Sequence, residues 1–86
     1  MNKEEIKEKV ISILKKYTRR EEVWENFNYN SDILNDLKIN SARLVDIILD
    51  IEDEFDLEVD DEAMDHIHTI NDVVEIIAEK KAEKKD

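Results

Sequence analysis

The sequence predicts an all-α protein: a small four-helix bundle of three main helices and one short helix, with a long first loop. Apolar residues recur at three- and four-residue spacing in three separate stretches, which is the period of helices that bury one face. Glycine and proline, the usual residues of tight turns, are both absent. A chain of 86 residues has room for one core. We therefore expect a single domain over residues 1–80 and a polar tail over residues 81–86.

The first helix is predicted from a single apolar face that ends near Tyr17 or Thr18. Asn2, followed three residues later by Glu5, is typical of a capping box at its start. The face consists of Ile6, Val10, Ile13, Leu14 and Tyr17.

Residues 18–40 lack a sustained period and predict a long connection, with a helical turn near "EEVWENF". Unstructured loops of this length are uncommon in small domains, so we expect some of the aromatic side chains of the loop, along with its aliphatic side chains, to pack on the core. These side chains are Trp24, Phe27, Tyr29, Ile33, Leu34, Leu37 and Ile39.

The second helix is predicted from Ser41 to Phe55. At about 100° per residue, a narrow core-facing band is formed by Leu44, Ile48, Ile51 and Phe55, with Ile47 beside it. The opposite side carries Asp46, Asp50 and Asp53. Val45 and Leu49 lie between the two faces, where they form either an exposed docking surface or a patch covered by the long loop.

The remaining segment predicts one short helix and one long helix. Leu57 and Val59 are expected core contacts, and the short helix is placed around residues 62–65. Thr69 followed by Asp72 is typical of a helix cap. The last helix is predicted from the amphipathic pattern of Ile70, Val73, Val74, Ile76 and Ile77.

Composition excludes several functional classes. Without cysteine there is no thiolate zinc site, and without glycine there is no phosphate-cradling P-loop or dinucleotide fingerprint. His66 and His68 are the only histidines, so we expect no metal site. The charged amino terminus and the lack of a long apolar run indicate no signal peptide and no membrane span. The simplest expectation is a cytoplasmic monomer.

Charge is distributed unevenly along the chain. The 24 acidic and 13 basic residues give a net charge of −11, which opposes nucleic-acid binding. Residues 1–20 hold seven basic and three acidic side chains (+4), whereas residues 41–65 hold one basic and eleven acidic side chains (−10). An acidic surface of this kind steers basic partners toward it.

Ser41 has three possible roles. It is an ordinary helix cap, a catalytic nucleophile or a site of modification. A nucleophile needs a base and an oxyanion hole, for which the sequence offers only the two histidines and no elbow motif. A modifying phosphodiester at a helix amino terminus would face unpaired N–H groups and the positive end of the helix dipole.

The stretch "NDLKINSARLVDIILDIEDEF" resembles the motif of acyl carrier proteins. That motif has an acidic residue and leucine, two loop residues, Asp-Ser-Leu, an apolar and acidic helix, and an "EEF"-like end. "HTINDVVEII" is similar to the start of the family's last helix, and the resemblance extends over nearly the whole chain. The family has a four-helix bundle with a long first loop, so the resemblance implies an acyl-carrier-like fold.

The resemblance implies a carrier and not an enzyme. Ser41 would hold 4′-phosphopantetheine, added by a phosphopantetheinyl transferase, and the thiol of that group would carry acyl groups as thioesters. The helix after the serine would bind basic docking patches on acyl-transferring and acyl-modifying enzymes of fatty-acid, lipid or specialised-metabolite synthesis. The matching docking positions are Val45, Asp46, Leu49, Glu52 and Asp53.

The motif also differs from the family pattern. Asn40-Ser41-Ala42 stands in place of Asp-Ser-Leu, Arg43 follows where an acid is usual, and Lys38 occupies a position where glycine is common. These differences favour a specialised carrier with a dedicated partner. Two alternatives remain: a carrier of aminoacyl or peptidyl groups, and an unmodified acidic adaptor that uses the same fold to bind a protein.

Overall fold

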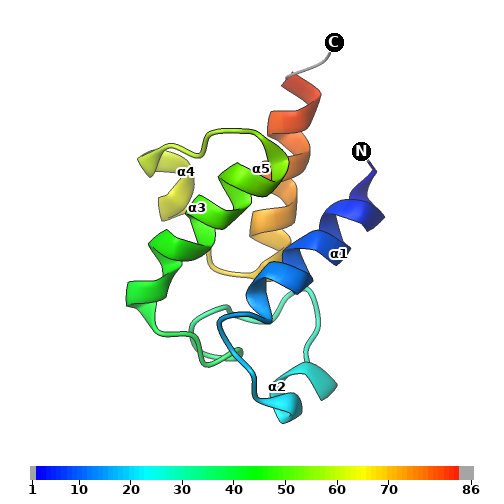
Figure 1. The fold of residues 1–86 in the computed structure, drawn as a ribbon, viewed down its shortest axis with the longest axis vertical. Helices are drawn as coiled ribbons and strands as arrows, with labels where there is room; N and C mark the ends of the chain where they lie inside the picture. The colour runs from blue at the N-terminus through cyan, green and yellow to red at the C-terminus, as the bar shows by residue number, and fades with distance from the viewer. Residues whose placement is uncertain (1, 84–86) are drawn as a thin grey trace.

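The computed structural model describes residues 2–83, which form a helical bundle (Figure 1). Its helices are α1 (Lys3–Leu14), α2 (Glu21–Glu25), the 3₁₀ helix η1 (Ser41–Arg43), α3 (Leu44–Phe55), α4 (Asp61–Asp65) and α5 (Ile70–Glu83). The long helices are α1, α3 and α5, and α4 is the predicted short helix. The helical turn expected near "EEVWENF" is present as α2. The all-α architecture with a long first loop is thus confirmed.

Helix α1 begins as its capping motif predicts and ends earlier than its apolar pattern predicts. The Asn2 side chain accepts a hydrogen bond of 2.9 Å from the Glu5 backbone N–H. The helix ends at Leu14, and turns continue to Tyr17. The Tyr17 backbone N–H donates to the carbonyl of Leu14, a three-residue spacing that tightens the chain out of the α-helix. Apolar spacing continues through that turn, which is why the sequence overestimates the helix.

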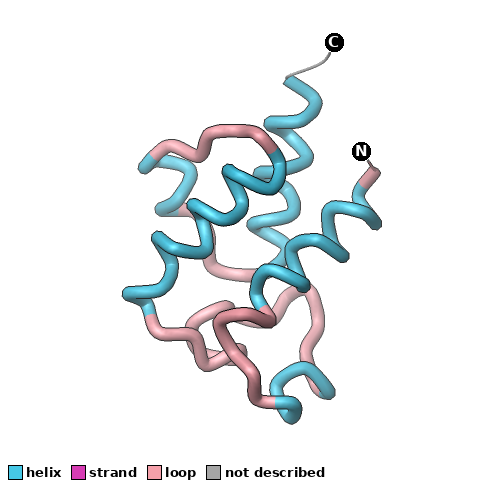
Figure 2. The backbone as a smooth tube through the Cα atoms, viewed as in Figure 1, coloured by secondary structure: helices cyan, strands magenta, loops and turns pink. Residues whose placement is uncertain are grey.

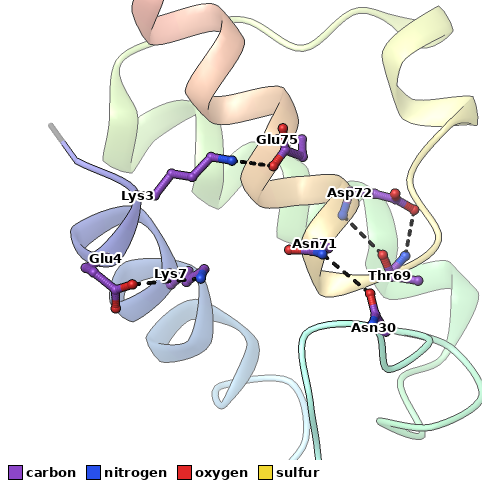
Figure 3. A network of polar contacts seen from close by, with 8 residues as sticks. All are labelled: Lys3, Glu4, Lys7, Asn30, Thr69, Asn71, Asp72 and Glu75. Atoms are coloured by element: carbon purple, nitrogen blue, oxygen red, sulfur yellow. Dashed lines mark hydrogen bonds and ion pairs between the residues drawn. The ribbon is translucent and has the colours of Figure 1, made fainter.

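Helix α5 begins at a reciprocal cap between Thr69 and Asp72. The Asp72 N–H donates to the Thr69 hydroxyl at 3.1 Å, and the Thr69 N–H donates to the Asp72 carboxylate at 2.9 Å (Figure 3). The predicted cap is therefore confirmed. The helix is also tied to α1 by an ion pair of 2.6 Å between Lys3 and Glu75. It continues to Glu83, and residues 84–86 of the expected tail lie outside the described residues.

The core forms where α1 packs against both α3 and α5. Its largest fully buried side chains come from every long element of the bundle and from the first loop: Phe55, Ile6, Leu14, Ile33, Leu37, Ile47, Ile51, Ile70, Ile77, Val10, Val73 and Val74. Leu57 and Val59, after α3, are buried as predicted. Burying these side chains supplies the stability that the β-branched residues of α5 do not supply through helix propensity.

The long loop is anchored at several points although little of it is helical (Figure 2). Ile33, Leu37 and Ile39 are buried, and Trp24, Phe27 and Tyr29 pack partly buried against the core. The rings of Trp24 and Phe27 meet edge to face at 5.2 Å. An isolated bridge pairs Asp32 with Thr69. These contacts hold the loop against the start of α5. They thereby fix the position of the last loop residues, which precede η1 and α3 in the chain.

Two predictions about individual core residues are wrong. Leu34 was expected to pack on the core but is 37% exposed. Leu44 is only partly buried, whereas Ile47, placed beside the core band, is fully buried. The helix projection does not include the neighbouring elements, and the packing of α3 against α1 helps to decide which side chains are covered. Ile48, Ile51 and Phe55 face the core as expected.

Candidate functional site

Ser41 lies at the point where the long loop enters η1, and its side chain is exposed. Its hydroxyl makes no hydrogen bond with any other residue in the range 2–83. Asn40 is the capping residue instead: its side-chain oxygen accepts a bond of 2.8 Å from the Ala42 N–H. The proposed cap role of Ser41 is therefore wrong, because the chain becomes helical one residue earlier than a cap at Ser41 requires. The Ser41 hydroxyl remains available to solvent.

The backbone around Ser41 differs from a simple helix amino terminus. The predicted second helix begins as η1, and α3 itself starts at Leu44. The Arg43 N–H donates to the Asn40 carbonyl at 2.8 Å, and the Ala42 N–H is taken by the Asn40 side chain. Two of the N–H groups expected to face an anion on Ser41 are thus already bonded. Two basic residues, Lys38 and Arg43, flank Ser41 in the sequence, and the Arg43 guanidinium is 3.1 Å from the Asp46 carboxylate.

Lys38 adopts a left-handed backbone conformation three residues before Ser41. Its φ of 60° is one that a side chain bearing Cβ normally avoids. Glycine adopts this conformation without a steric penalty. The turn of the loop before Ser41 is therefore made by Lys38, a residue for which this backbone conformation is sterically unfavourable.

Helix α3 exposes two large apolar side chains next to this loop. Val45 is 54% exposed and Leu49 is 56% exposed, and Asp53 continues the same four-residue spacing. The long loop does not cover them, so the covered-patch alternative is wrong. Asp53 is exposed and has no ion-pair or hydrogen-bond partner in the described range. Glu52 is partly buried and accepts a bond of 2.7 Å from the Val59 N–H.

The side of α3 that faces α1 carries a row of ion-paired acids. Asp46, Asp50 and Glu54 follow one another at four-residue spacing, and each lies within ion-pair distance of a cation. Arg43 is 3.1 Å from Asp46, Lys16 is 3.6 Å from Asp50 and Lys9 is 2.9 Å from Glu54. These pairs are exposed, so each stabilises the fold only slightly. Their effect is on the surface: they reduce the net negative potential of this side of the helix.

Asp50 has a second partner that the helix projection missed. The Tyr17 hydroxyl donates a hydrogen bond to the Asp50 carboxylate and so joins the end of α1 to the middle of α3. This bond, followed by desolvation and by the negative charge of Asp50, raises the pKa of Tyr17 to about 12. Asp50 thus contacts the segment after α1. The helix projection had placed it with Asp46 and Asp53 on the side opposite the core.

Lys9 and Lys16 are surface residues that contact α3 and that sequence reasoning did not identify. Lys9 lies within α1, whereas Lys16 lies in the turn after it. Their partners on α3 were not predictable from the sequence, because they depend on how the two helices pack. The hydrogen bond and charge of Glu54 raise the pKa of Lys9.

Other chemistries find no support within residues 2–83. No group of three or more potential metal ligands comes together there, and His66 and His68 are exposed. Among the described helices, none has the length and apolar character needed to cross a membrane.

Together these features are those of a small helical domain that presents an exposed serine directly before an acidic helix. Comparison with known proteins agrees with this class. The family model described as "Phosphopantetheine attachment site" matches residues 4–77. This chain belongs to that family, the phosphopantetheine-bearing carrier proteins.

Individual relatives support the same assignment. An acyl carrier protein from Coprothermobacter proteolyticus is 40% identical over 77 residues, which cover 90% of this chain and 92% of the relative. One from Prochlorococcus marinus is 37% identical over 83 residues, covering 94% and 99%. One from Caulobacter vibrioides is 36% identical over 58 residues, covering 67% and 74%. The chain is therefore an acyl carrier protein by family, and members of this family are carriers rather than enzymes.

Proposed function

We propose that this protein carries acyl groups as thioesters on a 4′-phosphopantetheine arm attached to Ser41. The observation that carries the proposal is the exposed and unbonded hydroxyl of Ser41, at the junction of the long loop and α3 and inside the matched range 4–77. The chain has two other serines. Ser12 is also exposed but lies inside the regular helix α1, and Ser31 is 7% exposed. Ser41 is the serine best placed to enter the active site of another enzyme.

The residues around Ser41 fit a phosphodiester. The site needs an accessible hydroxyl and room for an anion, and the neighbouring Asn40 and Ala42 are uncharged and exposed. Arg43 and Lys38 add positive charge on either side, which favours an anion in their vicinity. The arm would supply a thiol that holds the acyl group as a thioester. The protein's own part is to expose the attachment point and to offer a surface that partner enzymes recognise.

The partner surface is proposed to lie on α3. Val45 and Leu49 provide apolar contacts, and Asp46, Glu52 and Asp53 provide negative charge beside them. A phosphopantetheinyl transferase and acyl-transferring or acyl-modifying enzymes with basic docking patches would bind there. We propose a monomeric, cytoplasmic carrier with one domain over residues 1–80. The differences from the family motif at Asn40, Ala42 and Arg43 favour a specialised pathway with its own partners.

The experiment is intact-mass measurement after incubation with coenzyme A and a panel of phosphopantetheinyl transferases. The proposal predicts a gain of one phosphopantetheine group for the unmodified sequence and for Ser12→Ala, and no gain for Ser41→Ala. Circular dichroism of the three proteins controls for folding. A lack of any gain with every transferase, including those of the native host, would leave the unmodified adaptor as the function.

A further inference from the structure

The turn after α1 carries a concentration of positive charge that the carrier function leaves unexplained. Four exposed basic residues lie within six positions, Lys15, Lys16, Arg19 and Arg20, and we call them the basic border. They are four of only 13 basic residues in a chain of net charge −11. Such a cluster next to an acidic helix gives the surface one positively charged region and one negatively charged region.

A structural role explains only part of the basic border. Lys15 and Lys16 directly follow the last residue of α1, where cations interact favourably with the negative end of the helix dipole. Lys15 also lies over the Trp24 ring, with its Nζ 5.8 Å from the ring centroid. Arg19 and Arg20 lie beyond the range of the dipole effect. In residues 2–83 neither has an ion-pair partner, although three glutamates follow in α2.

The basic border adjoins the exposed surface of α3. Lys16 is 3.6 Å from Asp50, which is the neighbour of Leu49 in the sequence, and Tyr17 is bonded to the same carboxylate. Arg19 is three residues from Lys16, so their backbones are separated by at most about 11 Å. A typical protein interface covers about 800 Å² on each partner. A patch of that size is roughly 30 Å across. A partner that covers α3 and extends over the contact between Lys16 and Asp50 therefore comes close to Arg19 and Arg20.

The surface beside the basic border is hollowed. A depression of about 460 Å³ lies at this position. It is lined by Lys15, Thr18, Arg19, Glu21, Trp24 and Glu25. The depression has room for side chains of a partner, and its charged lining consists of two cations of the basic border, Lys15 and Arg19, and two carboxylates of α2.

We propose that the basic border receives an acidic segment of the same partner enzyme that binds α3 through basic residues. The inference rests on the proposed function, because it assigns a second contact to an enzyme recruited to the carrier. Charge complementarity selects a protein segment. Nucleic acid or an anionic membrane would bring many phosphates against residues 41–65, whose net charge is −10. An enzyme surface can match basic residues to α3 and acidic residues to the border, which fixes its orientation.

The first test is steady-state kinetics with a phosphopantetheinyl transferase that loads Ser41. The double variant Arg19→Glu/Arg20→Glu should raise KM for the carrier at least fivefold and leave kcat unchanged. The matched control, Lys80→Glu/Lys81→Glu in the last turn of α5, makes the same change in net charge at the opposite end of the bundle (Figure 1) and should change KM less than twofold. Both variants become more acidic. If the partner contacted only α3, the more acidic double variant would bind a basic partner equally well or more tightly. A KM that is unchanged or lower would therefore overturn the inference.

The second test does not need Ser41 to be modified and therefore separates this inference from the proposed function. A synthetic peptide of ten glutamates is titrated into ¹⁵N-labelled protein at low salt, with a ten-serine peptide as control. The amide signals of residues 15–25 should shift with the glutamate peptide, and the shifts should disappear in the double variant. Shifts distributed equally over all lysine-bearing segments would overturn the inference. So would self-association that the double variant abolishes, because it would assign the border to a second copy of the chain.

Discussion

The Tyr17 hydroxyl donates a hydrogen bond to the Asp50 carboxylate, and this bond connects the turn after α1 to the exposed helix α3. The same carboxylate is 3.6 Å from the Lys16 ammonium group. Asp50, which follows the exposed Leu49 in the sequence, is therefore held by two residues of the turn after α1. The orientation of the proposed docking helix depends on residues outside it.

Tyr17→Phe tests the strength of this connection. Removing the hydroxyl leaves the partly exposed Asp50 with one partner fewer, and we expect a loss of about 1 kcal/mol in the free energy of unfolding. The measurement is urea denaturation followed by circular dichroism. Lys15→Met is the control, because it alters the same turn without touching Asp50, and its effect should be within about 0.5 kcal/mol.

The raised pKa of Tyr17 gives this bond a specific pH dependence. The folded-state pKa of about 12 lies above the ordinary value of 10.0. The phenol contributes its full stabilisation below pH 10 and loses it as the pH rises from 10 toward 12. The wild-type protein should therefore lose more stability over that range than Tyr17→Phe does. Parallel alkaline profiles of the two proteins would contradict the assignment of Tyr17 as the donor.

Asn40 is predicted to contribute to the stability of the fold, whereas Ser41 is predicted to serve function and not stability. Asn40→Ala removes the bond to the Ala42 N–H and should cost about 1 kcal/mol of stability. Ser41→Ala removes a hydroxyl without a partner in the described range and should change stability by less than about 0.5 kcal/mol. Thermal denaturation measures both. A larger loss for Ser41→Ala than for Asn40→Ala would return the cap role to Ser41.

The exposed acids of α3 are predicted to contribute unequally to partner binding. Asp53→Lys should raise the Kd for a partner with a basic patch roughly tenfold, or about 1.4 kcal/mol. Asp46→Lys should have a smaller effect, because Arg43 already reduces the negative potential there. Both variants should keep their helical content, since neither residue belongs to the buried core. Isothermal titration calorimetry measures the Kd, and unchanged binding in both variants would contradict the placement of the docking surface on α3.

Lys38→Gly is predicted to stabilise the protein. A residue with Cβ at a φ of 60° costs about 1 kcal/mol, which glycine does not pay. The greater freedom of glycine in the unfolded chain offsets part of this gain, so we expect a net increase of about 0.5 kcal/mol. Chemical denaturation measures it. Lys38→Ala is the control, because it removes the charge and keeps the strain, and it should bring no increase.

The elements that sequence reasoning placed well are those whose signal is local. The cap at Asn2, the cap at Thr69 and Asp72 and the buried positions Ile48, Ile51 and Phe55 depend on residues within a few positions of one another. The candidate site was also locatable, because its motif is a continuous stretch around Ser41. The misplaced features depend on neighbours that are distant in the sequence, as Leu34 and Leu44 show.

Sequence alone was enough to predict the helical class, the main amphipathic helices, the excess of acid around α3 and membership in the carrier family. Periodicity, composition and a continuous motif are properties of the chain and need no packing partner. Only the tertiary structure decided that Asn40 and not Ser41 makes the cap, that Val45 and Leu49 stay uncovered, and that Asp50 is bound by Tyr17 and Lys16. Each of these depends on where the loop and α1 come to rest against α3. That placement is set by the burial of side chains from all elements together, and no single stretch of sequence contains it.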